Sequence, residues 1–312
     1  MFIEQAYKYQ HEFWRYIIGF MLIVLAVILG QIPLTVVLLM NGGLDPSMDQ
    51  MEMLNSLDSN YSFFLMLLTY AIGLLGIFFV AKNIHSQPIK ALTTSRKKID
   101  WGRVAFGFGI IAIISITTVS IDYYMNPEDY VMNFEPSKFY VMLLIALIFV
   151  PLQTSFEEYL FRGYLMQGFG ILSKTRWLPL ILTSVIFGGL HFFNPEVTKL
   201  GNIIMIYYIG TGFLLGIMTL MDEGMELSLG FHAGNNLITA VLVTADWTAF
   251  QTNSLLKDIS ESGTGWDNVY PILILYPVIL FIMAKRYKWN DWKGKLFGKV
   301  KEEKDFNSYL NS

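Results

Sequence analysis

The sequence predicts an all-α fold, a polytopic membrane bundle of about eight transmembrane helices. Of the 312 residues, 54% are hydrophobic and 15% are charged, whereas a soluble domain carries about 25% charged residues. The apolar residues come in stretches close to the length of a membrane-spanning helix. No stretch alternates with the two-residue period of a barrel strand. In hydrocarbon a helix also satisfies its own backbone amides, so helices are expected throughout.

Eight predominantly apolar stretches are expected to form the helices. In chain order they are residues 14–40, 61–80, 104–121, 139–152, 177–193, 200–220, 227–243 and 269–284. The first continues past Gln31 and Pro33 without a small-residue cleavage site, so we expect a retained anchor rather than a signal peptide. The fifth is expected to end inside the protein at Asn194 and Pro195.

The chain is expected to divide into three parts, with both termini in the cytoplasm. The parts are residues 1–138 with helices one to three, residues 139–245 with helices four to seven, and residues 246–312 with the last helix and a basic tail. Nineteen of the 22 basic residues fall on one side of this arrangement, which leaves Lys138, Lys199 and Lys257 opposite. Because basic residues mark the cytoplasmic side, both termini of this integral cell membrane protein are predicted to be cytoplasmic.

Charge and composition exclude several partners and chemistries. The net charge of -3 provides no basic field for nucleic acid, so the expected partners are membrane lipid and a membrane-associated peptide or protein. The chain has no cysteine, so a metal would have to use His and carboxylate ligands. His85 falls in a polar loop and is expected to be solvated.

The first polar cluster in apolar sequence consists of Glu157, Glu158 and Arg162. A charge at mid-bilayer costs about 2.5 to 3.5 kcal/mol on insertion scales, so these charges are expected to be paired, hydrated or functional. Glu158 and Arg162 stand four residues apart on a helix and can pair. Glu157, about 100° around the helix, has no obvious local partner. Alternatively, all three lie at the membrane interface at the end of the fourth helix.

Two further clusters interrupt the fifth and seventh apolar stretches. His191 is either a functional group or a hydrogen-bond bridge between helices. His232 and Asn236 stand four residues apart and so face one side of a helix. If the fourth helix continues to about residue 170 and the fifth begins near residue 178, Glu157 and His191 lie at one level of an antiparallel hairpin. One shared cavity would account for every polar group.

Together these residues have the chemistry for hydrolysis. A carboxylate can deprotonate water, one imidazole can position that water or carry its proton, and a second imidazole with an amide can donate to the oxyanion. A second arrangement uses Glu157, His191 and His232 as ligands of one divalent metal, zinc, with an open position for water. The residues leave both arrangements open. Economy of roles favours the metal-free one, because Glu157 then stays available as the base.

The sequence resembles the CAAX protease and bacteriocin-processing (CPBP) family of intramembrane proteases, which includes the type II CAAX prenyl endopeptidases. The family motifs are Glu-Glu-x-x-x-Arg, Phe-x-x-x-His and His-x-x-x-Asn. They match in this order at Glu157, Glu158 and Arg162, at Phe187 and His191, and at His232 and Asn236. The resemblance covers roughly residues 139–243, and hydropathy alone supports the other helices.

The resemblance implies that Glu157 and His191 activate water and that His232 and Asn236 stabilise the oxyanion. Glu158 and Arg162 would support them. The family has been described both as metallopeptidases and as metal-independent glutamate peptidases, so the resemblance leaves zinc undecided. The expected function is an intramembrane endopeptidase acting on a membrane-associated peptide or a lipidated protein tail. The alternatives are a catalytically silent immunity or scaffold protein and a small proton-coupled transporter.

Overall fold

The protein is a bundle of long helices, seen here in a computed structural model that describes residues 1–41, 50–260, 266 and 269–310. All eight predicted stretches contain a helix. These helices are α1 (Phe13–Met40), α3 (Ser59–Asn83), α5 (Trp101–Met125), α6 (Pro136–Glu158), α8 (Trp177–Leu190), α10 (Ile204–Asp222), α11 (Glu226–Leu242) and α12 (Tyr276–Tyr287). The all-α membrane fold is therefore confirmed.

Within the described residues, five helical segments are long and apolar enough to cross a membrane. They are α1, α3, α5, α10 and a continuous segment, Pro136–Ser173, that begins with α6. The helices α8, α11 and α12 have 14, 17 and 12 residues and are shorter than these. The number of helices that span the membrane therefore stays a prediction.

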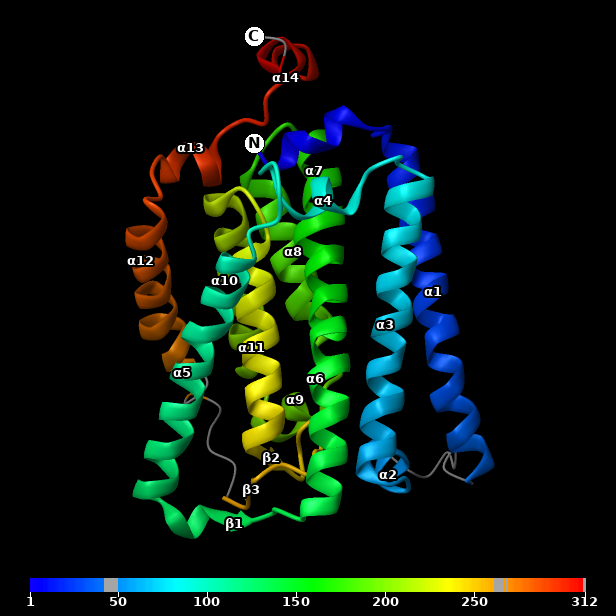
Figure 1. Cartoon of the computed structure of the whole chain (residues 1–312), viewed down its shortest axis with the longest axis vertical. Helices are drawn as coiled ribbons and strands as arrows, with labels where there is room; N and C mark the ends of the chain where they lie inside the picture. The colour runs from blue at the N-terminus through cyan, green and yellow to red at the C-terminus, as the bar shows by residue number, and fades with distance from the viewer. Residues whose placement is uncertain (42–49, 261–265, 267–268, 311–312) are drawn as a thin grey trace.

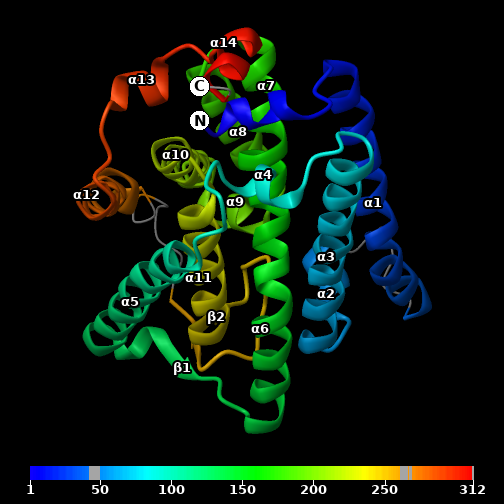
Figure 2. The ribbon, with the colours of Figure 1, turned by 45° about the horizontal axis from the view of Figure 1, so that its top comes forward.

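The helices form a central group flanked by two pairs. In both views α1 and α3 lie side by side at one edge of the bundle, while α5 and α12 lie at the other (Figures 1 and 2). Between them stand α6, α8, α10 and α11, which carry the polar clusters (Figure 1). The most extensive helix pairings are α5 with α11, α1 with α3, and α8 with α10.

The segment Pro136–Ser173 changes its helical geometry in the middle. After α6 comes a π-helical stretch, η3 (Tyr159–Leu165), and then α7 (Met166–Ser173). Lys174 at the end of α7 has a left-handed backbone, with φ of 57°, and α8 begins three residues later. The hairpin between the fourth and fifth predicted helices is therefore confirmed, close to the expected turn.

Short elements close the two ends of the bundle. At the end that holds the N-terminus lie η1 (Ile3–Lys8), α4 (Ile89–Thr93), α13 (Trp292–Phe297) and α14 (Glu303–Leu310) (Figure 1). At the opposite end lie α2 (Gln50–Asn55), η2 (Pro127–Asp129), α9 (Pro195–Leu200) and a small sheet. A second π-helical stretch, η5 (Pro271–Leu275), leads into α12. The fifth predicted helix, α8, ends at Leu190, shortly before the expected end at Asn194 and Pro195.

The small sheet was not predicted. It joins β1 (Tyr130–Met132), β2 (Val243–Ala245) and β3 (Leu256–Asp258) in the order β1-β3-β2. The β1–β3 pair is antiparallel, with Val131 opposite Lys257, and the β2–β3 pair is parallel. Each strand has three residues, too few for a periodic sequence signal.

The prediction that His85 is solvated is wrong. Its side chain is buried, because η1 and the following residues pack over the end of α3. Its Nδ1 lies 2.7 Å from the Gln10 carbonyl oxygen, and its Nε2 lies 3.1 Å from the Tyr164 hydroxyl. Burial lowers the pKa of His85. His85 therefore anchors the N-terminal segment to the bundle.

Close contact between α5 and α11 depends on glycine. A Cβ atom at Gly107 would overlap the Leu227 carbonyl oxygen, and one at Gly230 would overlap the Val104 carbonyl oxygen. His232 lies two residues beyond Gly230. The two glycines therefore set the distance between α5 and the helix that carries His232 and Asn236.

Replacing Gly107 with Ala is expected to lower the free energy of unfolding by about 1–3 kcal/mol, because an overpacked contact forces the backbone to shift. Gly109→Ala is the matched control on the same helix, since a Cβ there meets no described atom within 4 Å. Thermal unfolding of both variants in the same detergent measures the difference. Equal midpoints for the two variants would contradict the packing argument.

Candidate active site

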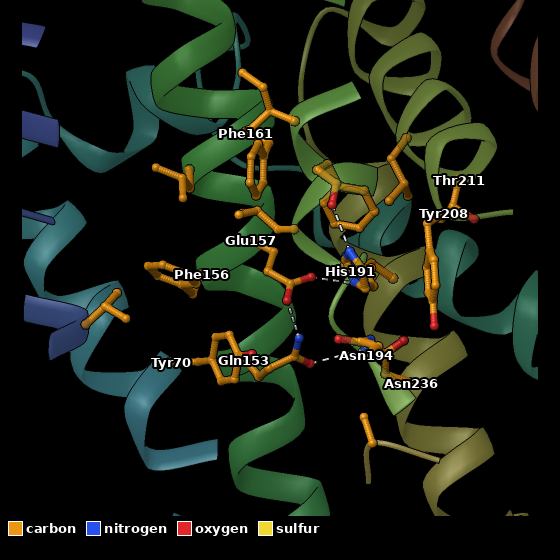
Figure 3. Close-up of a pocket in the computed structure, with 18 of the residues that line it drawn as sticks. Tyr70, Gln153, Phe156, Glu157, Phe161, His191, Asn194, Tyr208, Thr211 and Asn236 are labelled. Carbon is orange, nitrogen blue, oxygen red and sulfur yellow. Dashed lines mark hydrogen bonds and ion pairs between the residues drawn. The ribbon is translucent and has the colours of Figure 1, made fainter. Parts of the chain in front are cut away.

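A cavity of about 1160 Å³ lies inside the bundle and collects the predicted polar residues. Its described lining includes Glu157, His191, His232 and Asn236. In Figure 3, Gln153 and Glu157 point from α6 across the cavity towards His191, Asn194 and Asn236. The structure therefore brings three sequence clusters to one site, as predicted. Glu158 and Arg162 stand behind this surface and are not part of the cavity lining.

Glu157 is the carboxylate that faces the cavity. Its side chain is 12% exposed, against 0% for Glu158. Gln153, one helical turn earlier, donates from Nε2 to Glu157 Oε1 at 2.8 Å. The other oxygen, Oε2, lies 3.5 Å from His232 Nε2. Glu157 is thus held by one hydrogen bond and lies beside His232, which pairs with it when the ring carries a proton on both nitrogens, while part of the side chain stays accessible.

Glu158 and Arg162 form the predicted ion pair, with Arg162 Nη1 donating to Glu158 Oε1 at 2.9 Å. Both side chains are fully buried within the bundle. Arg162 also donates to the Gly212 carbonyl oxygen on α10 at 3.1 Å and lies 4.4 Å from the ring centre of Phe187 on α8. The pair therefore joins three helices beneath the cavity.

His232 lies between the two neighbouring carboxylates. Its Nδ1 is 3.0 Å from Glu158 Oε1, and its Nε2 faces Glu157. An Nδ1–H that donates to Glu158 fixes the orientation of the ring. The edge contact with Phe187, at 6.0 Å between ring centres, adds to this restraint. His232 therefore presents Nε2 to the cavity from a rigid support.

His191 follows the last residue of α8, where the helix leaves backbone carbonyls available. Its Nδ1 lies 2.8 Å from the Phe187 carbonyl oxygen. His191 therefore forms a hydrogen bond within its own helix and not a hydrogen-bond bridge to another helix. The ring stacks on Tyr208 of α10, with centres 4.5 Å apart and planes 23° apart. An Nδ1–H in this bond leaves Nε2 as an acceptor, and Nε2 has no protein partner in the described chain.

Asn236 is linked to Glu157 through a single side chain. Its Nδ2 donates to Gln153 Oε1 at 3.2 Å, and Gln153 in turn donates to Glu157. Asn236 and His232 both project from α11 towards α6, as their spacing predicted. The amide of Asn236 keeps a second N–H for another acceptor.

Three cavity residues were missed by sequence reasoning. Gln153 had a usable signal, because it is a polar residue in an apolar stretch, four positions before Glu157. Tyr208 had none, since tyrosines are common in membrane helices. Glu196 lies in a short connecting segment, where acidic residues are ordinary. Its position in the cavity wall depends on contacts between distant parts of the chain.

The zinc alternative does not fit this arrangement well. Nowhere in residues 1–41, 50–260, 266 and 269–310 do three His, Asp or Glu side chains group closely enough to hold one metal ion. His232 Nδ1 faces Glu158, and Glu157 Oε1 accepts a hydrogen bond from Gln153, so these two atoms already have partners. The residues instead match a set of proton acceptors and hydrogen-bond donors around an open space.

The candidate site lies in the part of the chain that matches a known protein family. A family model described as type II CAAX prenyl endopeptidase Rce1-like matches residues 136–238, which include all six predicted site residues. The chain is 32% identical over 267 residues to YyaK of Bacillus subtilis (strain 168), which is described as an uncharacterized protein. The similarity covers 84% of this chain and 88% of YyaK. No solved structure matches the chain significantly.

Proposed function

Because the chain belongs to the Rce1-like family of type II CAAX prenyl endopeptidases, we propose that it is an intramembrane endopeptidase. Its substrate is a membrane-associated peptide or a lipidated protein tail. The observation that carries the proposal is Glu157, a cavity-facing carboxylate held between Gln153 and His232. A carboxylate supported in this way can take a proton from water at a defined place.

Hydrolysis begins with water bound between Glu157 and His191 Nε2. Glu157 takes a proton from the water, and the hydroxide oxygen adds to the carbonyl carbon of the peptide bond. Glu157 then gives the proton to the amine nitrogen as the carbon–nitrogen bond breaks. One group thus serves as base and then as acid.

His232 and Asn236 stabilise the tetrahedral intermediate. Both lie on α11 and face Glu157 or its partner Gln153. When substrate occupies the cavity, the second N–H of Asn236 can turn to the oxyanion, and His232 donates from Nε2 when its ring carries a proton on both nitrogens. Donors placed in advance need little rearrangement. Glu158 and Arg162 act as positioning residues, because Glu158 orients His232 and Arg162 balances the charge of Glu158.

The apolar wall of the cavity is suited to a membrane-associated substrate. On one side it is formed by α1, where Ile17, Phe20 and Met21 line the cavity and are also exposed on the bundle surface. An apolar chain can lie against this wall while its peptide bond reaches Glu157. The N-terminus and α14 lie at one end of the bundle, which is consistent with two cytoplasmic termini (Figure 1).

Purified protein in proteoliposomes tests the proposal. Cleavage of a membrane-bound peptide, followed by mass spectrometry of the products, is the expected result. A transporter would move a solute across the same vesicles without cleaving peptide, and a silent scaffold would do neither. Absence of cleavage over a broad set of apolar peptides would contradict the proposal.

We expect peptide cleavage to continue in excess chelator, because the proposed water activation uses Glu157 and His191 alone. Elemental analysis of active, tag-free protein is the accompanying measurement. Stoichiometric zinc that disappears together with activity in His191→Ala and His232→Ala would contradict this expectation. Recovery of activity on adding zinc would do so as well.

A further inference from the structure

The cavity has an uneven distribution of charge. Two carboxylates, Glu157 and Glu196, belong to its described lining, and no Lys or Arg does. All 22 basic residues of the chain fall within the described ranges, so the segments outside them contribute none. Lys199, close to Glu196 in sequence, has an exposed side chain and is not part of the lining. The cavity surface is therefore acidic.

Of the two cavity carboxylates, Glu196 has a buried oxygen without a hydrogen-bond partner in the described chain. It lies in the first turn of α9, and its Oε1 accepts a hydrogen bond from the Ala249 N–H at 2.8 Å. The other oxygen, Oε2, is buried without a hydrogen-bond partner in the described chain. Burial raises the pKa of Glu196, whereas the nearby His191 opposes this change. The carboxylate thus lacks the full set of donors that a buried charge requires.

The two cavity carboxylates are not equivalent. Glu157 has Gln153 and His232 against its two oxygens. Glu196 has one backbone donor and the ring of His191 nearby. A cation brought beside Glu196 favours the charged form of its carboxylate, and in a wall of low dielectric the attraction between them is little screened. Glu196 therefore attracts positive charge in the cavity and repels negative charge.

We infer that Glu196 selects substrates with a cationic side chain, Lys or Arg, near the cleaved bond and disfavours those that place a free carboxylate there. This inference rests on the proposed peptidase function. It narrows the substrate class from any membrane-associated peptide to an apolar segment that carries positive charge. A free C-terminal carboxylate close to the cleavage point would meet Glu157 and Glu196 without a cation to balance it.

A binding measurement tests the inference apart from turnover. The full chain carrying Glu157→Gln is placed in nanodiscs, so that bound peptide is not consumed. The probes are three fluorescent apolar peptides of about 20 residues, long enough to enter a bilayer. They are identical except for Lys, Gln or Glu at one central position. The same three dissociation constants are measured after adding Glu196→Gln.

Glu196→Gln is the suitable change because an amide oxygen can still accept from the Ala249 N–H while the charge is removed. Peptide partitioning into lipid is the same for both proteins, so it cancels when their Lys-to-Glu affinity ratios are compared. The Lys peptide is expected to bind about tenfold more tightly than the Glu peptide to the protein with Glu196, a preference of the size that one partly screened charge provides. Most of this preference is expected to disappear in the protein that carries Glu196→Gln.

Two outcomes would overturn the inference. One is equal affinity for the Lys and Glu peptides, and the other is a Lys preference that Glu196→Gln leaves unchanged. Cleavage of the Gln peptide by the protein with Glu157 intact is measured in parallel. If the Gln peptide is cleaved but binding shows no preference for the Lys peptide over the Glu peptide, the inference fails while the proposed function stands. If charge selectivity in binding is found without cleavage of any peptide, the proposed function fails instead.

Discussion

Replacing Glu157 with Gln is expected to lower peptide turnover by about 100-fold or more, the usual size of a lost acid–base group. An amide cannot take the proton of the attacking water, although it keeps the shape of the side chain. Its oxygen can still accept the hydrogen bond from Gln153, so the local structure is retained. Initial rates of peptide cleavage at saturating substrate measure the effect.

Glu128→Gln is the matched control, since Glu128 is exposed in η2 and outside the cavity. That variant is expected to cleave peptide at the rate of the unchanged protein. Circular dichroism and thermal unfolding check that both variants keep the fold. Normal turnover in Glu157→Gln would remove the central residue of the mechanism and with it the proposed function.

Replacing Arg162 with Met is expected to cost about 3–5 kcal/mol of unfolding free energy, because it leaves the buried carboxylate of Glu158 without its cation. The guanidinium also holds the Gly212 carbonyl and stacks on Phe187, so the contact between η3, α8 and α10 is weakened. Thermal unfolding and the fraction of protein that stays monodisperse in detergent measure the loss.

The double variant Glu158→Gln with Arg162→Met separates charge from packing. Removing both charges together is expected to recover much of the stability, since no uncompensated carboxylate remains. Lys138→Met on α6 is the surface control, because its ion pair with Glu135 is exposed on both sides. That change is expected to cost about 0–1 kcal/mol. Similar losses for Arg162→Met and Lys138→Met would contradict the role given to the buried pair.

Features with a local cause could be predicted from the sequence. Hydropathy located all eight helices, because apolar composition by itself marks such segments. The Glu158–Arg162 pair follows from a spacing of one helical turn. The meeting of Glu157 with His191 followed from counting residues to the hairpin, and the helix and turn lengths proved close to those assumed.

Features that depend on distant contacts could not be predicted. His85 is buried only because the N-terminal segment folds back over α3, a contact that no local pattern encodes. The partners of Glu157 required knowing that α11 faces α6, which places His232 beside it. The small sheet pairs β1 with a strand more than a hundred positions away, so neither strand alone carries a signal.

The π-helical stretch, Tyr159–Leu165, has a consequence for insertions and deletions. A substitution leaves the rotational phase of the segment unchanged, whereas losing one residue turns everything before it by about 100° relative to α7. Glu157 would then point away from His191. Variation in this part of the chain is therefore restricted in length as well as in residue type, and a deletion here would be more harmful than most replacements of its apolar side chains.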